Sequence, residues 1–415
     1  MTKTTKENLK QFKSSINGLN RIKRPIYGRG TSELANRMGL MLRDLKSSSV
    51  DPLLGVELIA SFYETDQAVL SNCDDSTGYV SDIYKYEAPE YFKEYAKNCD
   101  GKEKIAEIIL KLNLADDFGV RDSLIDCAGE FLPESVVRVM IEKLQILTDE
   151  DKNKDEDGFS RFFYLIESLA RQIGDAKLYE ETCKAHLTEL SGASIIDIGR
   201  VYLESGDGNT ALTWANKISE KAYYMANERE RLLVDIYKEL GDGENLIEIL
   251  HHRLRREPTI YALDKLLKVI GTDKRDSIVT DEVDFIMNKT DFRKNQSIFL
   301  VEVNRYTAAE EYLIRWADHI NGDFYDPLLP IVKILEKNSL YLAASLIYRR
   351  LLISILEKGY TKAYSHGVKY LKKLDQMAKS IIDWRGCESH IDFKDKILQK
   401  HRYKRSFLSK YESGL

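Results

Sequence analysis

The sequence of 415 residues predicts an all-α protein, and three observations support this fold class. Proline (7 residues) and glycine (23 residues) are scarce, although folds rich in loops or short strands need many of both. From Ser32 onward, apolar residues recur at the spacing of one helix face. Beyond residue 158, turn-forming fragments return at steps of 30 to 35 residues. We therefore expect an N-terminal helical domain followed by a tetratricopeptide-like α-solenoid.

Residues 1–30 are basic, with eight Lys or Arg side chains against one acid, Glu7. Aromatic residues are sparse there, and we identify no apolar periodicity before Ser32. We interpret this segment as a solvated basic N-terminal arm, with contact to a polyanion or an acidic partner as the alternative.

Cysteine usage and hydropathy bear on the compartment. The five cysteines have no paired spacing, which is typical of reduced thiols. The first residues lack the apolar core of a signal peptide, and no apolar run approaches the ~18 to 20 residues that span a bilayer. We predict a cytoplasmic protein that is neither exported nor inserted in a membrane.

Residues 31–148 are predicted to form the N-terminal helical domain. Ser32 and Pro52 are residue types that favour helix starts. Pro89 lies inside an aromatic helical stretch and is expected to bend or interrupt it, because proline has no N–H to donate. Helices are expected at residues 32–45, 52–63, 79–95, 102–114, 118–131 and 133–147.

Residues 149–158 contain six acids and no apolar side chain, so we predict an acidic linker and a domain boundary there. The segment has the acidic spacing of a calcium loop from Asp151. However, Glu156 stands where that loop needs glycine, and Phe162 stands where it needs a closing acid. The spacing therefore argues against calcium.

Residues 159–340 are predicted to form the tetratricopeptide-like helical repeats. Glycine or asparagine suits the left-handed residue that ends the first helix of each pair. Small residues early in the second helix allow the two helices to approach closely, and they are Ala211, Ala308, Ala309, Ala343 and Ala344. The expected turn positions are Gly174, Gly206, Gly241 and Gly271 and, more loosely, Asn304 and Asn338.

Residues 341–415 are predicted to form a basic C-terminal helical cap, with helices at 340–356, 362–382 and 391–408. Sixteen basic residues stand against seven acids, a net charge of +9. The whole chain carries −5 and residues 1–30 carry +7, so the middle of the chain carries −21. The sequence thus describes an acidic body with two basic ends.

The C-terminal cap also holds the densest group of candidate binding residues. Five of them fall at i, i+4, i+7, i+8 and i+11 and would share one helical face, which could bind phosphate or acidic side chains. The alternative is a solvated face on a capping helix. The candidate partner-binding residues are Lys362, Tyr364, His366, Lys369, Tyr370, Lys373, His401, Tyr403, Lys404 and Arg405.

Metal binding and catalysis receive little support from the sequence. Cys387 and His390, with His366 and His401, could supply four zinc ligands, but structural zinc sites bring close ligand pairs on both sides. We predict no metal or cofactor. Nucleophile-elbow, zinc-protease, P-loop and dinucleotide-binding motifs are missing. An enzyme built on His366 stays as a third hypothesis, and a deep pocket around that histidine would be its sign.

Three segments carry a resemblance to a known family. They are residues 73–83 (CDDSTGYVSDI), residues 116–125 (DDFGVRDSLI), and a C-terminal set comprising Lys362 to His366, Tyr370-Leu371, Asp383-Trp384, His390 and His401 to Phe407. With them the chain resembles an uncharacterised bacterial family of helical proteins, and its C-terminal part is similar to the tetratricopeptide-like repeat region of SWIM zinc-finger proteins. The resemblance implies a cytosolic helical protein with no established activity and no catalytic residues. The C-x-C…C-x-H finger itself is missing.

Two functional hypotheses follow. The first is a non-catalytic scaffold of a bacterial cytosolic complex, whose concave repeat surface binds a protein partner. An acidic middle favours a partner with basic segments. The alternative is a nucleic-acid-associated protein of a bacterial defence or DNA-maintenance system, which would bind phosphates through its basic ends. The acidic body argues against that alternative.

Overall fold

The computed structural model describes residues 3–48, 50–152, 161–219 and 224–413. The elements of these residues are helices, and the only β feature among them is an isolated bridge between Ile26 and Cys73. The predicted all-α, tetratricopeptide-like fold class is therefore confirmed. The chain divides into two compact units, unit 1 (Met1–Leu240) and unit 2 (Gly241–Leu415).

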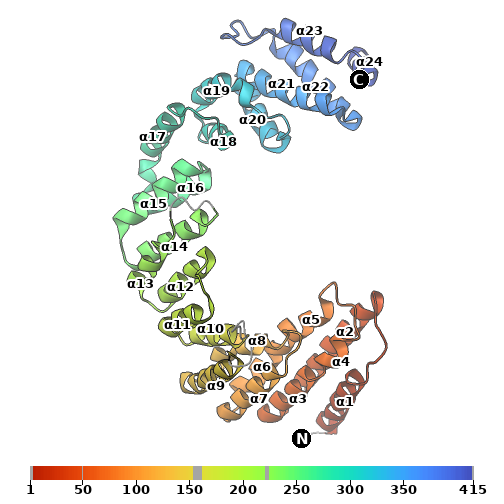
Figure 1. Cartoon of the computed structure of the whole chain (residues 1–415). Coiled ribbons are helices and arrows are strands. Elements are labelled where there is room, and N and C mark those ends of the chain that lie inside the picture. The colour runs from red at the N-terminus through yellow and green to blue at the C-terminus, as the bar shows by residue number, and fades with distance from the viewer. Residues whose placement is uncertain (1–2, 49, 153–160, 220–223, 414–415) are drawn as a thin grey trace. The chain divides into compact units, whose positions relative to one another are not determined.

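Unit 1 begins with a layered array of antiparallel helices (Figure 1). Helix α3 packs against α6 and α7, and α7 packs against α9. The buried side chains of α1 to α10 form one hydrophobic core. The elements are α1 (Lys3–Leu19), α2 (Arg29–Lys46), α3 (Pro52–Tyr63), α4 (Asp66–Leu70), α5 (Tyr79–Asp82), η1 (Ile83–Glu87), α6 (Ala88–Lys97), α7 (Lys102–Leu114), α8 (Asp122–Asp126), η2 (Ala128–Glu130), α9 (Glu134–Lys152) and α10 (Phe162–Gln172).

Helix α1 corrects the prediction of a solvated arm. Leu9, Phe12, Ile16 and Leu19 are buried against α2 and α3. Their spacing of three, four and three residues places them on one helix face, with the lysines between them on the other. The exposed Lys10 and Lys13 therefore lie on the outer face of a packed helix.

Two other predicted helices differ in detail. The stretch 79–95 is interrupted as expected, because η1 is a π-helical turn that leads into α6, with Pro89 in the first turn of that helix. The helix predicted over 118–131 is confirmed in part, because α8 and η2 form within it but residues 118–121 do not continue the helix. Gly119 has φ +64°, and the Asp116 carboxylate accepts hydrogen bonds from the backbone N–H of Phe118 (3.0 Å) and of Arg121 (2.8 Å). These bonds hold residues 116–121 in a loop.

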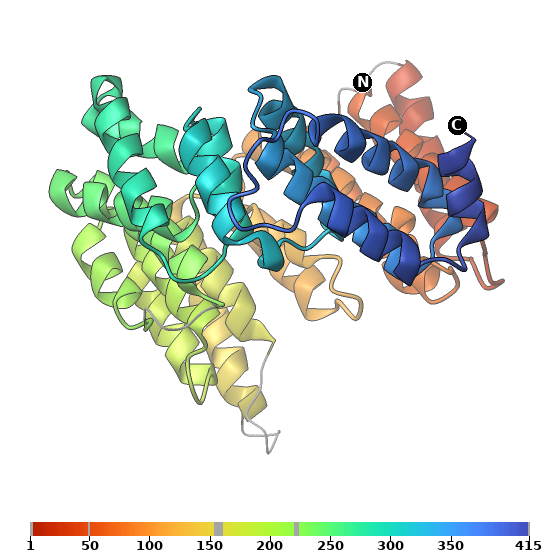
Figure 2. The ribbon, with the colours of Figure 1, turned by 90° about the horizontal axis from the view of Figure 1, so that it is seen from above.

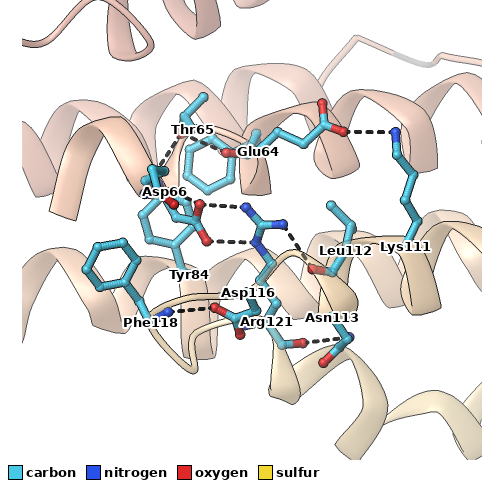
Figure 3. A network of polar contacts seen from close by, with 12 residues as sticks. Glu64, Thr65, Asp66, Tyr84, Lys111, Leu112, Asn113, Asp116, Phe118 and Arg121 are labelled. Carbon is cyan, nitrogen blue, oxygen red and sulfur yellow. Dashed lines mark hydrogen bonds and ion pairs between the residues drawn. The ribbon is translucent and has the colours of Figure 1, made fainter. Parts of the chain in front are cut away.

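That loop also delivers Arg121 to a buried ion pair (Figure 3). The Arg121 guanidinium donates to both carboxylate oxygens of Asp66, at 2.7 and 2.6 Å, and to the carbonyl of Leu112 at 2.9 Å. Burial alone would lower the pKa of Arg121, but the bond to Asp66 raises the pKa above its ordinary value. Arg121 therefore joins three segments of the unit 1 core with its charge compensated.

The predicted acidic linker falls largely outside the described residues. Residues 149–152 continue α9, and 153–160 are not described. The helices on either side, α9 and α10, pack together. The boundary predicted at 149–158 stays a prediction, whereas the two compact units meet at Leu240 and Gly241.

From α10 onward the helices form the predicted pairs. Helix α10 packs against α11, and α12 packs against α13. In unit 2, α18 packs against α19, and α20 packs against α21. The remaining repeat helices of unit 1 are α11 (Ala176–His186), α12 (Gly192–Glu204), α13 (Gly208–Ala215) and α14 (Ala226–Glu239).

Unit 2 continues the succession of helices, which Figure 2 shows from above as green and cyan elements leading into blue ones. Ala309, Ala343 and Ala344 are fully buried early in α19 and α21, as the close approach of paired helices requires. The elements are α15 (Gly243–Arg256), α16 (Ile260–Ile270), η3 (Thr272–Lys274), α17 (Arg275–Met287), α18 (Lys294–Glu302), α19 (Tyr306–Arg315), η4 (Ala317–His319), α20 (Tyr325–Lys337), α21 (Tyr341–Lys358), η5 (Thr361–Ala363), α22 (Tyr364–Met377), α23 (His390–Lys400) and α24 (Arg405–Glu412).

The turns between paired helices have the predicted left-handed residues. The backbone φ is positive at Gly174, Gly206, Gly241, Gly271 and Asn304, as expected, but at the last turn Ser339 takes this role and Asn338 does not. In three Gly-Asp turns the aspartate caps the next helix: Asp175, Asp207 and Asp242 each accept a bond from the backbone N–H three residues on. Two adjacent residues thus end one helix and start the next.

Among the described helices, none is both long and apolar enough to cross a bilayer.

Candidate functional site in the C-terminal helices

Helix α21 is the central element of the C-terminal part of unit 2. It has buried residues on all sides, and α19, α20 and α22 pack around it. Helix α22 in turn packs against α24, where the ring of Tyr364 meets the ring of Phe407 edge-on at 5.8 Å. Gly367 lies at this contact, because a Cβ there would come within 3.2 Å of Phe407.

Asp375 on α22 joins the last three helices. Its carboxylate bonds to Nε2 of His390 at 2.8 Å, accepts a bond from Nζ of Lys394 at 2.9 Å, and accepts a further bond from the hydroxyl of Tyr411. Burial opposes ionisation, but these three bonds lower the pKa of Asp375 below its ordinary value. His390, which belongs to the segment that carries the family resemblance, therefore has a structural bond here.

Three of the predicted binding residues are engaged within the fold. Tyr364 (3% exposed) and His401 (8% exposed) are buried, so they pack in the core and lie away from the surface proposed for them. Burial lowers the pKa of His401, and the nearby lysines Lys404 and Lys400 lower it further. The ammonium of Lys373 lies 2.6 Å from both carboxylate oxygens of Glu336 on α20.

The other predicted residues lie at the surface. Lys362, Lys369 and Arg405 are exposed, and Lys404 is half-buried. Tyr403 is 80% exposed, with the guanidinium of Arg402 donating to its hydroxyl at 3.0 Å. The ten candidate residues thus separate into core, ion-paired and exposed residues. The two buried ones, Tyr364 and His401, do not belong to the predicted helical face, whose members are exposed or half-buried.

His366 and Tyr370 come together in a pocket of about 550 Å³, which we call the aromatic pocket. It is formed by α20, α21, α22 and the segments next to them. Two exposed tyrosines, Tyr325 (56% exposed) and Tyr360 (63% exposed), stand at it. Its lining residues are Gly322, Asp323, Tyr325, Leu329, Leu351, Ser354, Ile355, Lys358, Tyr360, Ala363, His366 and Tyr370.

Three polar groups of the aromatic pocket, those of Asp323, Ser354 and Lys358, are bonded to one another. The hydroxyl of Ser354 donates to the carboxylate of Asp323, and the ammonium of Lys358 lies 2.9 Å from the same carboxylate. Among the described contacts, His366 bonds neither Ser354 nor Asp323. A nucleophile activated by histidine is therefore not assembled in this arrangement.

A second hollow of about 820 Å³ was not predicted from the sequence, and we call it the arginine groove. It lies on a different face of α21, between α19, α23 and residues 385–388. Six basic and three acidic side chains line it. The one sequence signal for it is the pair Arg349-Arg350 inside the otherwise apolar helix YLAASLIYRRLLISILEK. The basic lining residues are Arg315, Arg349, Arg350, Arg385, Lys396 and Lys400.

The four zinc-ligand candidates have separate surroundings. His366 lines the aromatic pocket, Cys387 lines the arginine groove, His390 bonds Asp375 and His401 is buried. Within the described ranges, no group of three or more His, Cys, Asp or Glu side chains has an arrangement that could hold a metal ion.

Comparisons with known proteins give distant structural neighbours. The structure of Naa15/Naa10 bound to HypK-THB has a TM-score of 0.33 and 11% sequence identity, and the alignment covers 97% of this chain and 63% of that chain. This chain therefore spans less than two thirds of the length of that neighbour. A circular tandem repeat protein with novel repeat topology has a TM-score of 0.19 and 13% identity, with 97% of this chain and 90% of that chain covered. No curated protein matches.

One family model matches nearly the whole length of the chain. It describes a family of unknown function, DUF6880, and it matches residues 9–174 and 160–410. The expected membership of an uncharacterised family is therefore confirmed, and the chain belongs to the DUF6880 family.

Proposed function

We propose that this protein is a non-catalytic helical-repeat scaffold that binds a protein partner, with the aromatic pocket as a principal contact. The observation that carries the proposal is that pocket: about 550 Å³ of mostly apolar surface flanked by two exposed tyrosines. Tyrosine and tryptophan dominate the binding energy of protein interfaces when a partner covers them. A hollow of this size accommodates one or two large side chains of a partner.

The predicted residues around the pocket support this assignment. Tyr360 precedes Lys362, and His366 and Tyr370 line the wall. Exposed cations at Lys362 and Lys369 lie on the same helical segment and would form a polar rim. The free state of all five cysteines is consistent with the cytoplasmic location that we propose. The similarity of the C-terminal part to SWIM protein repeats stays a proposal from sequence.

Catalysis by His366 is the second candidate, because this exposed histidine lines the pocket. The carboxylate among the described lining residues, Asp323, is engaged with Ser354 and Lys358. Binding is therefore better supported than chemistry. Nucleic-acid binding through the basic ends receives less support, because Lys373 is paired with Glu336 and α1 packs its apolar face into unit 1.

Site-specific photo-crosslinking tests the proposal. A photoreactive phenylalanine analogue replaces Tyr360 in the full chain, expressed in its native host. The control carries it at Tyr86, an equally exposed tyrosine (69%) in unit 1. We expect one discrete protein adduct from position 360 and none of that identity from position 86.

The partner found in this way is then purified and titrated. Tyr360→Ala and Tyr325→Ala should each weaken its binding about 10-fold or more, as truncation of an interface hot spot does. Their unfolding temperatures should not change, because both rings are exposed. No discrete adduct at 360, or equal affinity of wild type and both variants, would contradict the proposal.

A further inference from the structure

Arg349 in the arginine groove is a buried charge without a counter-ion. Arg349 is 5% exposed, and one of its guanidinium nitrogens, Nη1, donates to the carbonyl of Glu388 at 2.7 Å. Its Nε and Nη2 have no hydrogen-bond partner among the described residues. No carboxylate of the described chain lies within ion-pair distance of it.

The surroundings of Arg349 are aromatic. The rings of Trp384 and Phe393 lie 4.8 and 4.6 Å from the guanidinium carbon. Burial lowers the pKa of Arg349 to about 10, even though Glu388 and Cys387 act in the opposite direction. The group is thus charged at neutral pH, in a site where an unpaired charge and unmade hydrogen bonds are both costly.

Most of the other cations of the groove are paired with an acid. Arg350 pairs with Asp318, Lys400 lies 2.7 Å from Glu357, and Lys396 lies 3.5 Å from Glu388. Arg385 lies 3.5 Å from Glu310, and Arg315 donates to the carbonyl of Met287, so the excess positive charge of the lining belongs to Arg315 and Arg349. An anionic ligand would supply what Arg349 lacks.

We propose that the arginine groove binds an acidic peptide segment, in which carboxylates alternate with apolar side chains, and that Arg349 receives one of these carboxylates. The planar guanidinium fork matches a carboxylate in geometry. Between the cations the lining is apolar, through Ile314, Leu346, Ile353, Phe393 and Ile397. A ligand that fills the groove therefore needs apolar groups as well as charge.

A peptide fits this lining better than a nucleic acid. Asp318, Glu357 and Glu388 are interspersed among the cations and would repel a continuous phosphate backbone, whereas separate carboxylates can avoid them. The acidic middle of the chain favours a partner with basic segments. The basic groove at the C-terminal end instead favours an acidic partner.

Binding also requires a local movement. The two unbonded nitrogens of Arg349 are buried, and the segment that holds Trp384 and Glu388 lies against them. Within this segment Arg385 has φ +46°, which non-glycine residues rarely adopt. A carboxylate that reaches Arg349 displaces this segment, so the fluorescence of Trp384 reports on occupancy.

The test uses the full chain and two synthetic hexapeptides, acetyl-ELEAEL-amide and its glutamine counterpart acetyl-QLQAQL-amide, in calorimetric and fluorescence titrations. We expect the glutamate peptide to bind about 10-fold or more tightly than the glutamine peptide, as charge-assisted hydrogen bonds do. Trp384→Phe should remove the fluorescence change. Arg349→Met should abolish the preference, and Arg349→Lys should retain part of it.

Lys337→Met is the matched control, because it removes one exposed positive charge outside the groove and should leave the preference unchanged. If circular dichroism shows Arg349→Met to be unfolded, the proposal is tested by Arg349→Lys and by the difference in affinity between the two peptides. Equal affinity for both peptides, or an unchanged preference in a folded Arg349 variant, overturns the proposal. Displacement of the peptide by a twelve-nucleotide thymidine strand, or by inorganic phosphate at equal concentration, also overturns it.

The inference rests on the proposed scaffold function only in taking its ligand to be part of a protein. Tyr360→Ala, in the aromatic pocket, should not change binding of the glutamate peptide. If the peptide test fails but a partner is captured at position 360, only the proposal for the arginine groove is rejected. If the glutamate peptide binds as expected but no partner is captured at position 360, only the proposal for the aromatic pocket is rejected.

Discussion

Two arginines, Arg121 and Arg349, are buried to nearly the same extent, at 4% and 5% exposed. Arg121 meets both oxygens of Asp66, and its charge is compensated inside unit 1. Arg349 meets one backbone carbonyl and two aromatic rings. Because a buried ion pair is largely structural and an unpaired buried charge calls for a ligand, the two residues have different expected roles despite equal burial.

Glu282 on α17 is the acidic counterpart of Arg349. It is 2% exposed, its Oε1 has no hydrogen-bond partner among the described residues, and burial raises its pKa to about 7. The folded chain therefore keeps a proton that the unfolded chain releases above pH ~4.5. It follows that this group lowers stability progressively as the pH rises from about 4.5 to about 7.

Glu282→Gln should remove this penalty. We expect the variant to be more stable than wild type by roughly 1 to 2 kcal/mol at pH 8, a range that allows for partial solvent screening, and by less at pH 5. Urea unfolding at the two pH values measures the difference. Glu311→Gln, at an exposed position on α19, is the control and should change little. An equal gain at both pH values would contradict the titration of Glu282.

Residue-level prediction of the site from sequence was partly successful. Helical spacing placed His366 and Tyr370 on one face, and they do share a pocket. Tyr364, another candidate residue of the same helix, is covered by α24, and spacing within one helix does not report on a later helix. Arg349 was missed because its significance lies in the carboxylate that it lacks, which only the three-dimensional contacts show.

At the scale of elements, the Gly-Asp turn is the main regularity. Gly206 has φ +85°, and no atom lies within 4 Å of where its Cβ would be. The adjacent Asp207 accepts from the backbone N–H of Thr210 at 3.0 Å, and that bond lowers the pKa of Asp207. Glycine is needed there for backbone conformation alone.

Gly206→Ala should therefore destabilise unit 1 by about 1 to 2 kcal/mol, the cost of a left-handed conformation for a residue with a Cβ. Gly18→Ala is the matched control. It lies in helix α1 with equally open space around its Cβ position, and alanine there should be neutral or slightly stabilising. Chemical denaturation of both variants makes the comparison. Equal stability of the two variants would show that the turn does not require a left-handed residue.

Elements were predicted well where local chemistry decides them. The left-handed positions through Asn304 were correct because glycine and asparagine are the residues that adopt this conformation. The last turn uses Ser339, a residue type that gives no such signal. The helix expected at 118–131 begins only at α8, because Asp116 bonds the backbone N–H groups of Phe118 and Arg121 and holds that segment in a loop.

At the scale of the whole molecule, the chain divides into two compact units between Leu240 and Gly241. The sequence suggested a boundary at the acidic residues 149–158, because composition records solvation and not the density of contacts. The hydrophobic core of unit 1 includes residues of α9 and of α10, on both sides of that segment. A division that falls inside the repeat region has no compositional signal.

Two units predict two unfolding transitions in scanning calorimetry. Asp66→Asn should lower the free energy of unfolding of unit 1 by about 3 to 5 kcal/mol, because it leaves the Arg121 charge buried and unpaired. The transition of unit 1 should therefore move to a lower temperature. Glu282→Gln should raise only the transition of unit 2 at pH 8. Hydrogen exchange of α3 and of α17 assigns each transition to its unit. A single transition that both substitutions move would show that the units unfold cooperatively.

The Gly-Asp turns have an evolutionary consequence. Each joint is encoded by two neighbouring residues, Gly174-Asp175 or Gly206-Asp207, whose positive φ and capping bond both lie within the turn and the helix that follows it. A gene duplication that extends from one such joint to the next would copy a helical module together with the Gly-Asp residues that end and begin its helices. Chains of this design can therefore grow or shrink by whole modules, and relatives of different length would be expected to differ by multiples of one joint-to-joint interval.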